Sequence, residues 1–435
     1  MTAVEEKLQL PRIYKQTVKM ALYDLCIVGA GMMGSAAARH ASEKSGVKVC
    51  LIGPQEPKIR EIVSGNEVFG THYDEGRIMR ATATSPLWAD LAKRSEERYR
   101  ELENLSGVQF YHEIGALTVG TRYGQFIGRT KSSLKGGPKG YDNVEILAAK
   151  ELNDKFPYLT FADNDEGIME KSRAGYINPR KMVMAQIVVA VNQGCDVIRD
   201  IVLNIEKLQG VYKLTTERGK IIWTKKVLLA TNAFTGMHQL LKNPVSYKAM
   251  PQTVTLAAVS ENTAKRLSQM PVVLYEGKGG ESWSKTYPRD SSDNIQFYLL
   301  PPIKYPDGKY YIKIGHSDDI LKGSLELTDI RKWYSGKGDE ELEEELFKLL
   351  DTIFHGVRFE NHHGDACATM VTPGKQPYID LLSPTLAVAL GGNGYAAKSS
   401  DEIGRIAADL ILTSKWTYDI PKENFKVKFH VPSKL

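Results

Sequence analysis

Three glycines near the start of the chain have the spacing of a phosphate-binding turn. Gly29, Gly31 and Gly34 follow an apolar run at residues 25–28 in a GxGxxG pattern. The first glycine permits a tight turn, the second lets the backbone approach a pyrophosphate, and the third lets a helix pack closely on the strand. The residues predicted to form this dinucleotide-binding turn are Gly29, Ala30, Gly31, Met32, Met33 and Gly34.

The elements expected around these glycines are those that such a turn needs. An unbroken apolar run such as residues 25–28 is typical of a parallel strand buried on both faces. An alanine-rich helix is expected from Met32 to about Lys44, and a second strand from Val47 to Ile52. The N-terminus of that helix would direct unpaired N–H groups and a partial positive charge at the phosphates. Strand, turn, helix and strand together are far more specific than the glycines alone.

One expected residue is missing from this pattern. The acidic residue that usually ends the second strand and binds the adenosine ribose is absent, because Gly53 occupies its place. Glu56, three residues later in the loop, is the candidate replacement. The phosphate assignment does not depend on it.

A second glycine turn precedes a helix near the end of the chain. The turn at 391–394 follows an apolar strand pattern at 386–390, and Ser399 with Glu402 has capping-box spacing. Two such glycine turns at opposite ends of the sequence predict one nucleotide-binding domain assembled from separated segments. The cofactor-binding candidates of this second turn are Gly392, Asn393 and Gly394.

The chain as a whole is expected to have an α/β fold. A Rossmann-like nucleotide-binding domain, with a parallel sheet and helices, would be joined to a substrate domain built on a mixed antiparallel sheet with helices. Aromatic residues are frequent at 252–315, where they either pack a sheet or form a wall around a substrate. The predicted boundaries are an N-terminal arm at 1–22, a nucleotide domain at 23–84, 170–245 and 355–413, a substrate domain at 85–169 and 246–354, and a tail at 414–435.

Composition and charge exclude several classes of protein. A net charge of +5, spread over 435 residues, argues against nucleic acid as a partner. Apolar runs stay well short of the roughly 20 residues that a membrane-spanning helix needs. Residues 1–21 carry dispersed charges and lack the apolar core of a secretory signal.

The cysteines show no metal-binding spacing, so no metal site is expected. Cys26, Cys50 and Cys195 lie in or beside apolar strand patterns and are expected to be small buried hydrophobic residues. The last three residues, Ser433, Lys434 and Leu435, form an SKL tripeptide, which is a peroxisomal address read by an import receptor. The predicted location is therefore the peroxisome.

From about residue 23 to 413 the chain resembles the sarcosine oxidase and pipecolate oxidase branch of the D-amino-acid-oxidase-like flavoenzymes. Beside the first glycine turn, the resemblance depends on HYDEGRIMR at 72–80, KIGH at 313–316, ACATM at 366–370 and GGNGYAAKSSDEIG at 391–404. Members of this family use FAD to oxidise the C–N bond of secondary or N-methylated amino acids, and pass the electrons to oxygen to give hydrogen peroxide. The resemblance implies FAD rather than NAD, a small amine substrate such as sarcosine, pipecolate or a sugar-amine amino acid, O2 as co-substrate, and a monomer.

The resemblance also implies roles for individual cations. Arg77 would lie beside the flavin ring, and Arg80 would bind the substrate carboxylate with the help of Lys398. Arginine suits that task because its planar fork can donate two hydrogen bonds to a carboxylate. The alternative for both arginines is a set of surface ion pairs in a polar loop. One additional residue before Lys398, compared with the family pattern, leaves its reach open.

Three further residues are matched to the reaction centre. Lys313 resembles the lysine placed near flavin N5 that stabilises charge as oxygen is reduced, the alternative being an exposed residue of a strand. His316 would be a polar group of the substrate site or a surface histidine. Cys367 matches the position at which many members attach FAD covalently, and is otherwise a buried inert thiol. Thr369 and Asn232 replace a tyrosine and a glycine of the family pattern.

Three alternatives remain beside an FAD-dependent amine oxidase. A flavin-dependent amine dehydrogenase would pass its electrons to another acceptor and produce no peroxide. An NAD-dependent dehydrogenase is favoured only by the glycine motif. A catalytically silent flavin-binding protein would keep the cofactor and lack the reaction.

Overall fold

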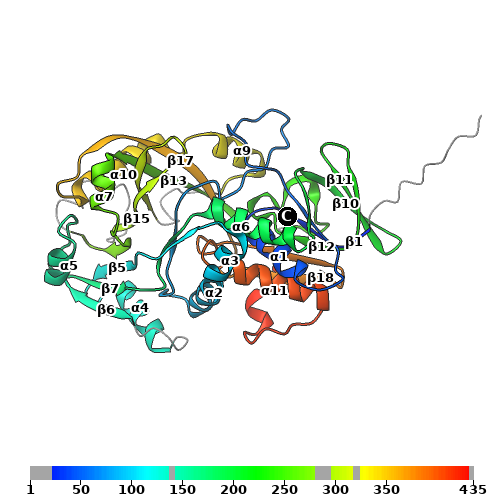
Figure 1. Cartoon of the computed structure of the whole chain (residues 1–435), viewed down its shortest axis with the longest axis horizontal. Coiled ribbons are helices and arrows are strands. Elements are labelled where there is room, and N and C mark those ends of the chain that lie inside the picture. The colour runs from blue at the N-terminus through cyan, green and yellow to red at the C-terminus, as the bar shows by residue number, and fades with distance from the viewer. Residues whose placement is uncertain (1–21, 137–142, 280–294, 317–323, 431–435) are drawn as a thin grey trace, which may run out of the picture.

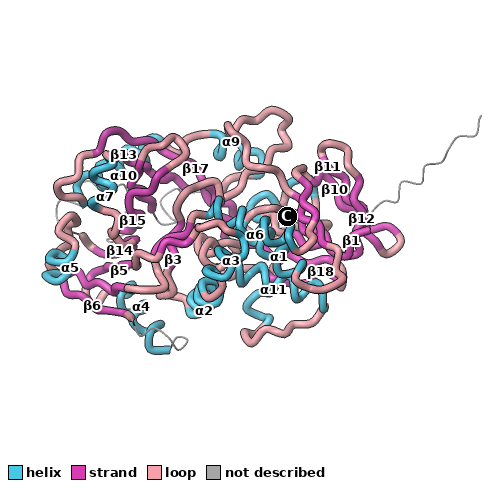
Figure 2. Tube along the Cα trace, in the orientation of Figure 1, coloured by secondary structure: helices cyan, strands magenta, loops and turns pink. Residues whose placement is uncertain are grey.

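The computed structural model describes residues 22–136, 143–279, 295–316 and 324–430. The predicted N-terminal arm up to residue 21, Trp283, Tyr287 and the terminal SKL tripeptide lie outside these ranges. The described strands form two eight-stranded sheets and one three-stranded sheet. The two large sheets occupy opposite ends of the long axis, with β3 between them (Figures 1 and 2).

The first sheet contains the predicted nucleotide-binding strands. β1 pairs in parallel with β2 and β12, β2 with β9, and β12 with β19, whereas β10, β11 and β18 add antiparallel pairs. Its strands are β1 (Leu22–Val28), β2 (Val49–Ile52), β9 (Asp196–Ile198), β10 (Val202–Leu208), β11 (Val211–Thr216), β12 (Ile221–Leu229), β18 (Tyr378–Ser383) and β19 (Leu386–Leu390).

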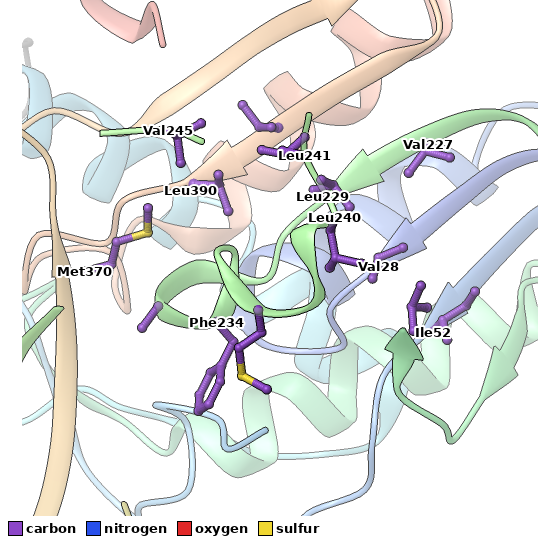
Figure 3. Close-up of a cluster of buried hydrophobic side chains, with 14 of the residues drawn as sticks. Val28, Ile52, Val227, Leu229, Phe234, Leu240, Leu241, Val245, Met370 and Leu390 are labelled. Carbon is purple, nitrogen blue, oxygen red and sulfur yellow. The ribbon is translucent and has the colours of Figure 1, made fainter. Parts of the chain in front are cut away.

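The carboxyl ends of the parallel strands meet at one edge of this sheet. Val28, Ile52, Leu229 and Leu390 are the last residues of β1, β2, β12 and β19, and all four are buried in one apolar core. Figure 3 shows these side chains with Met370, which approaches from the other sheet. Ligands of doubly wound folds bind beyond this edge, where the loops that follow the strands lie together.

Two helices from opposite ends of the chain pack closely on this sheet. α1 (Met32–Ser42) lies against α11 (Ser400–Thr413) and α6 (Pro179–Asn192). A Cβ at Gly404 of α11 would lie 2.6 Å from Ala36 Cβ and from Ala37 N of α1. Glycine at position 404 therefore sets the separation of the two helices. The helix predicted at 32–44 is confirmed, with its end at Ser42.

The second sheet is mixed, as predicted. Its strand order is β17-β13-β16-β15-β14-β5-β7-β6, and only the β14–β5 pair is parallel among those described. The strands are β5 (Ala116–Thr121), β6 (Val144–Ala148), β7 (Asp165–Glu170), β13 (Lys248–Val259), β14 (Val272–Gly277), β15 (Ile295–Lys304), β16 (Tyr310–His316) and β17 (Phe359–Val371).

The two faces of the second sheet differ in character. α10 (Glu340–Ile353) covers one face, where its leucines join an apolar core with alternate residues of the strands. Successive side chains of a strand alternate between faces, so residues paired across the ladder share a face. By that register Lys313 and Cys367 share a face, because they are joined through alternate residues of β13. This face carries the candidate site.

A three-stranded sheet and the remaining helices complete the described fold. The small sheet consists of β3 (Arg77–Met79), β4 (Tyr111–His112) and β8 (Gly175–Ile177). The other helices are α2 (Pro86–Glu96), α3 (Tyr99–Ser106), α4 (Gln125–Gly136), α5 (Ala149–Lys155), α7 (Glu261–Arg266) and α9 (Leu327–Ser335), with 3₁₀ turns at η1 (Asn232–Phe234), η2 (Met237–Gln239) and η3 (Lys422–Phe425). No described helix combines the length and apolar character needed to cross a membrane.

Two predicted boundaries are wrong in detail. The boundary at 355 assigns β17 to the nucleotide domain, but the strand pairs with β13 along most of its length in the second sheet. The segment at 85–106 was assigned to the substrate domain, but α2 packs on α11 and α3 on α6. Long-range pairing and helix packing decide both assignments, and neither leaves a local signal in the sequence.

Candidate active site

A cavity of about 550 Å³ lies between the carboxyl edge of the first sheet and the face of the second sheet that carries Cys367. The loops that follow β1, β2, β12 and β19 line one side of it. Segments of the long loop at 54–76 and strands β13, β14, β15 and β17 line the other. The cavity therefore spans both predicted domains.

The first glycine turn lies at one end of this cavity and is built for close approach. Gly29 has φ +109°, and a Cβ there would collide with the carbonyl of Ala230. A Cβ at Gly34 would collide with the carbonyl of Gly29. Residues 28–33 line the cavity, so a phosphate-bearing ligand can approach the backbone directly.

The missing acidic residue has a steric explanation. A Cβ at Gly53 would lie 2.5 Å from the backbone nitrogen of Ala30, within the phosphate-binding turn. The carboxylate of Glu56 accepts hydrogen bonds from Arg180 Nε at 2.8 Å and Nη2 at 2.7 Å. Glu56 is also absent from the cavity lining, so the structure does not favour it as the ribose-binding replacement.

Two asparagines occupy left-handed backbone positions that favour glycine. Asn232, after β12, has φ +44°, and Asn393, after β19, has φ +49°. Asparagine tolerates this conformation better than most residues, which accounts for Asn232 where the family pattern has glycine. Asn393 Oδ1 accepts the N–H of Thr372 at 2.8 Å, and both asparagines line the cavity with Gly392 and Gly394.

Arg80 and Lys398 are brought together in the cavity from opposite ends of the sequence. Both line the cavity, and each is only 5% exposed. Arg80 donates to the carbonyl of Thr82, and Tyr99 Oη donates to the carbonyl of Lys398 at 2.7 Å. The additional residue before Lys398 thus leaves it within the cavity. The alternative of surface ion pairs is wrong for Arg80, since the side chain is buried.

A buried carboxylate, Glu170, stands beside these two cations. It accepts hydrogen bonds from the N–H of Ala81 at 3.0 Å and from Thr82, which fixes the segment that carries Arg80. Burial raises the pKa of Glu170, against the effect of Thr82 and Arg80. Burial and the charge of Arg80 lower the pKa of Lys398 to about 7, and Glu170 opposes them. We call Arg80, Lys398 and Glu170 the clamp.

Lys313 is buried beside the cavity and is not part of its lining. Its Nζ donates to Asp74 Oδ2 and to the carbonyl of Gly76, each at 2.6 Å. Tyr305 Oη donates to Asp74 Oδ1 at 2.8 Å, and Arg77 forms a further ion pair with Asp74. Burial, assisted by Arg77, holds the pKa of Lys313 well below its usual value. The alternative of an exposed strand residue is wrong, because Lys313 is 1% exposed.

Arg77 links this cluster to Cys367. Both residues line the cavity, and Arg77 Nη2 lies 3.9 Å from Cys367 Sγ. The main chain around Cys367 is held by α9, because Trp333 Nε1 donates to its carbonyl at 2.7 Å. The half-buried thiol is thus available to a ligand in the cavity, whereas Cys26, Cys50 and Cys195 are buried as predicted.

Three histidines line the cavity: His72, His238 and His316. His316, at the end of β16, is 3% exposed, so it is not a surface histidine. His72 lies near Gly31 and was not assigned a role from the sequence. Burial and the nearby Arg180 and Arg77 lower the pKa of His72 to about 3, so its imidazole is neutral.

The predicted capping box at the start of α11 is wrong. Ser399 is the N-cap residue, but its side chain makes no capping hydrogen bond. The N–H of Glu402 donates instead to Ser95 Oγ at 3.0 Å, and the Glu402 carboxylate binds Arg98 and Arg405. The arginines outcompete the N-cap backbone for this carboxylate.

A separate group of potential metal ligands lies outside the cavity lining. The described residues Glu343, Glu344 and His362 bring one ligand-type atom each within 4.8 Å of one another. His362 Nδ1 is already 2.6 Å from Glu343 Oε1. This ion pair accounts for the arrangement without a metal.

The cavity suits the cofactor that the resemblance implies. The glycine turn, the left-handed asparagines and the half-buried thiol of Cys367 line one continuous space, in which FAD would extend from residues 29–33 to Arg77 and Cys367. Glu170, Asp74 and His72 were missed from the sequence. Glu170 and Asp74 carried only the weak signal of an acidic residue beside a predicted strand or loop.

Comparisons with known proteins agree with this assignment. Residues 24–410 match the family described as FAD dependent oxidoreductase. Monomeric sarcosine oxidase from Arthrobacter sp. (strain TE1826) is 25% identical over 415 residues, covering 92% of this chain and 94% of that protein. N-methyl-L-tryptophan oxidase from Yersinia pestis is 24% identical over 396 residues, covering 89% and 94%.

Solved structures share the fold. NikD, an amino acid oxidase essential for nikkomycin biosynthesis, superposes with a TM-score of 0.72 at 20% identity, covering 94% of this chain and 98% of that one. Fructosamine oxidase from Aspergillus fumigatus gives 0.68 at 16% identity, covering 93% and 89%. Because the family match extends over most of the chain, the protein belongs to the FAD dependent oxidoreductase family.

Proposed function

We propose that this protein is an amine oxidase that uses FAD and O2 to oxidise the C–N bond of a secondary or N-methylated amino acid to an imine, with release of H2O2. The observation that carries the proposal is that Arg80 and Lys398 are both buried and both line the cavity that the glycine turn also lines. A pair of buried cations at one end of a cavity is suited to a carboxylate. The names of the relatives, sarcosine oxidase and N-methyl-L-tryptophan oxidase, support an N-methylated amino acid.

The clamp would orient the substrate. Arg80 would donate two parallel hydrogen bonds to the carboxylate, and Lys398 would donate a third. Glu170 keeps the segment of Arg80 in place through its hydrogen bonds to Ala81 and Thr82. FAD, when bound, supplies the acceptor for the two electrons and the hydrogen leaving the carbon next to nitrogen. Fixed orientation would then supply much of the rate.

Anaerobic mixing with a panel of amines tests this proposal. Sarcosine, pipecolate and N-methylated aromatic amino acids should bleach the yellow colour of the purified protein, and the esters of the same compounds should not. In Arg80→Met the rate of bleaching by the free amino acids should fall by about two orders of magnitude or more, because a charged hydrogen-bonded pair in a buried site is lost. Arg122→Met, at an exposed position, is the control. A flavin that no amine bleaches would indicate the catalytically silent alternative.

A dehydrogenase is the second candidate, and one observation favours it. Lys313, the residue expected to promote reaction with oxygen, is paired with Asp74 and set back from the cavity lining. Peroxide formed in air at the rate of substrate consumption identifies an oxidase. Turnover that requires an added electron acceptor identifies a dehydrogenase.

Covalent attachment of FAD through Cys367 is part of the proposal. Its support is the half-buried thiol that lines the cavity near Arg77. After denaturation in acid, the yellow colour should stay with the polypeptide, and in Cys367→Ser it should stay in the supernatant. Colour in the supernatant of the unmodified protein would contradict the linkage.

We also propose a peroxisomal monomer. The terminal SKL tripeptide supports import by the peroxisomal receptor, and a fluorescent fusion lacking Ser433, Lys434 and Leu435 should remain in the cytosol. Light scattering after gel filtration should give the mass of one chain, 48.5 kDa. A mass near twice that value would contradict the monomer.

A further inference from the structure

The cavity continues past the clamp along one face of the second sheet. Glu170 shares this face with Val272 of β14, because both pair with Ala116 of β5. Two residues further along β14, Leu274 pairs with Tyr298. Two residues beyond that, Glu276 pairs with Gln296. Leu274, Tyr298, Glu276 and Gln296 all line the cavity.

The register gives the scale of this extension. Val272 and Glu276 are four residues apart on β14, which corresponds to roughly 13 Å at the rise of a β-strand. An apolar and aromatic stretch, Leu274 and Tyr298, thus separates the clamp from a polar end. Sarcosine, which has no side chain, would leave that end unused.

Glu276 is the acidic group at the polar end of the cavity. It is half-buried, and among the described residues its carboxylate makes no hydrogen bond or ion pair that would satisfy it. Burial raises the pKa of Glu276, and the charge of Arg129 opposes that shift. A half-buried carboxylate on the cavity wall can accept hydrogen bonds, so a ligand that supplies a charged donor there gains affinity.

Arg129 does not donate a hydrogen bond to the Glu276 carboxylate in this structure. It is exposed at the rim, on α4, and its Nη2 donates to Gln125 Oε1 at 3.1 Å. Water screens the charge of an exposed guanidinium far more than that of a half-buried carboxylate. The distal end of the cavity is therefore dominated by Glu276 as an acceptor.

We infer that the preferred substrate is an amino acid whose side chain ends in a cationic donor, an ammonium or a guanidinium, bound by Glu276 while the clamp holds the carboxylate. The inference rests on the proposed function for the identity of the reacting amine. The apolar middle section of the substrate side chain would lie over Leu274 and Tyr298.

Binding of unreactive ligands tests the inference without turnover. Calorimetry on the FAD-loaded protein compares ω-amino carboxylates, from 4-aminobutanoate to 8-aminooctanoate, with the plain fatty acids of equal length. At the best length the amino compound should bind about tenfold to a hundredfold more tightly, the range expected for a hydrogen bond to a charged group. Glu276→Gln should remove that advantage and leave the affinity for the plain acids unchanged. Glu340→Gln, exposed on α10 behind the sheet, should behave as wild type.

Substrate oxidation gives the second readout. N-methyl-lysine should have a kcat/KM at least tenfold above that of N-methyl-norleucine, and Glu276→Gln should equalise them. Glu276→Lys should reverse the preference in favour of N-methyl amino acids that end in a carboxylate. The inference is overturned if amino and plain acids bind equally, or if the tighter binding of the amino acids persists in Glu276→Gln. Bleaching of the flavin by neutral amines would then show that the proposed function still holds. If no amine bleaches it, the proposed function fails, and the binding series still decides the role of Glu276.

Discussion

Lys398 couples the clamp to pH. Burial and the charge of Arg80 lower its pKa to about 7, and a bound carboxylate would raise that value by stabilising the ammonium. Binding above pH 7 therefore requires uptake of one proton. The dissociation constant of a plain carboxylate should be constant below about pH 7 and should rise by about tenfold per pH unit above it.

Calorimetry across neutral pH checks this prediction. Lys398→Met should bind more weakly at low pH and lose the pH dependence, because the titrating group is gone. Replacement of Arg80 should weaken binding but keep the pH dependence, moved to higher pH, because Lys398 still titrates and the charge that lowers its pKa is gone. An unchanged slope in Lys398→Met would assign the proton to another group.

Lys313 is the residue expected to act on oxygen. Lys313→Met should slow reoxidation by O2 on the order of a hundredfold and leave reduction by substrate nearly unchanged, since only the first of these steps needs the fixed charge. Stopped-flow measurement of the two half-reactions separates the effects. Lys309→Met, exposed and next to β16, is the control. Unchanged half-reactions would show that pairing with Asp74 has removed the oxygen role.

At the level of elements, the contact between α1 and α11 holds the two glycine turns together. Gly404→Ala would place a methyl group 2.6 Å from the backbone nitrogen of Ala37, so the helices must move apart. We expect a loss of about 1–3 kcal/mol in the free energy of unfolding, together with weaker retention of FAD. Chemical denaturation and the flavin content of the purified variant measure both effects.

A matched glycine on another helix separates packing from helix propensity. Gly128 lies in α4, and a Cβ there would meet no atom within 4 Å. Gly128→Ala should therefore raise stability by up to about 1 kcal/mol. If Gly404→Ala were as stable as Gly128→Ala, the close approach of α1 and α11 would not be required.

For the molecule as a whole, Asp401 is the main buried junction of the nucleotide-binding part. It binds Arg39 and Arg98 at 2.7 Å each and Gln186 at 2.8 Å, which joins α11 to α1, α6 and the segment between α2 and α3. His40, Arg39 and Arg98 hold the pKa of Asp401 well below its usual value of 3.8, against the effect of burial. Asp401→Asn should cost about 3–5 kcal/mol, as expected when one partner of a buried ion pair is removed.

The pH dependence of that cost identifies its origin. A carboxylate with a lowered pKa stabilises the fold above its unfolded pKa, and this stability is lost as the pH falls through the folded value. The difference between wild type and Asp401→Asn should be constant at neutral pH and shrink below about pH 4. Urea unfolding at several pH values measures it, with the exposed Asp163→Asn as control. A pH-independent difference would indicate a packing effect.

Local pattern was enough to predict the first half of the site. Residues 25–53 carry the glycine spacing, the apolar runs and the alanine-rich helix in one short segment, so sequence neighbours fix the phosphate-binding turn. The α/β fold and the mixed second sheet follow from the same periodicities. The burial of Cys26, Cys50 and Cys195 was predictable for the same reason.

The sequence alone thus determined the fold class and the first glycine turn. Only the tertiary structure decided that Glu170 lies near Arg80 and Lys398, that Asp74 holds Lys313, and that Glu276 lies on the same sheet face as Glu170. These contacts join residues from different sheets and distant segments, and they depend on strand register and on helix separation at Gly404. Register and packing are properties of the assembled chain, because a shift of one residue in a strand would turn Glu170, Lys313 or Glu276 to the other face of the sheet.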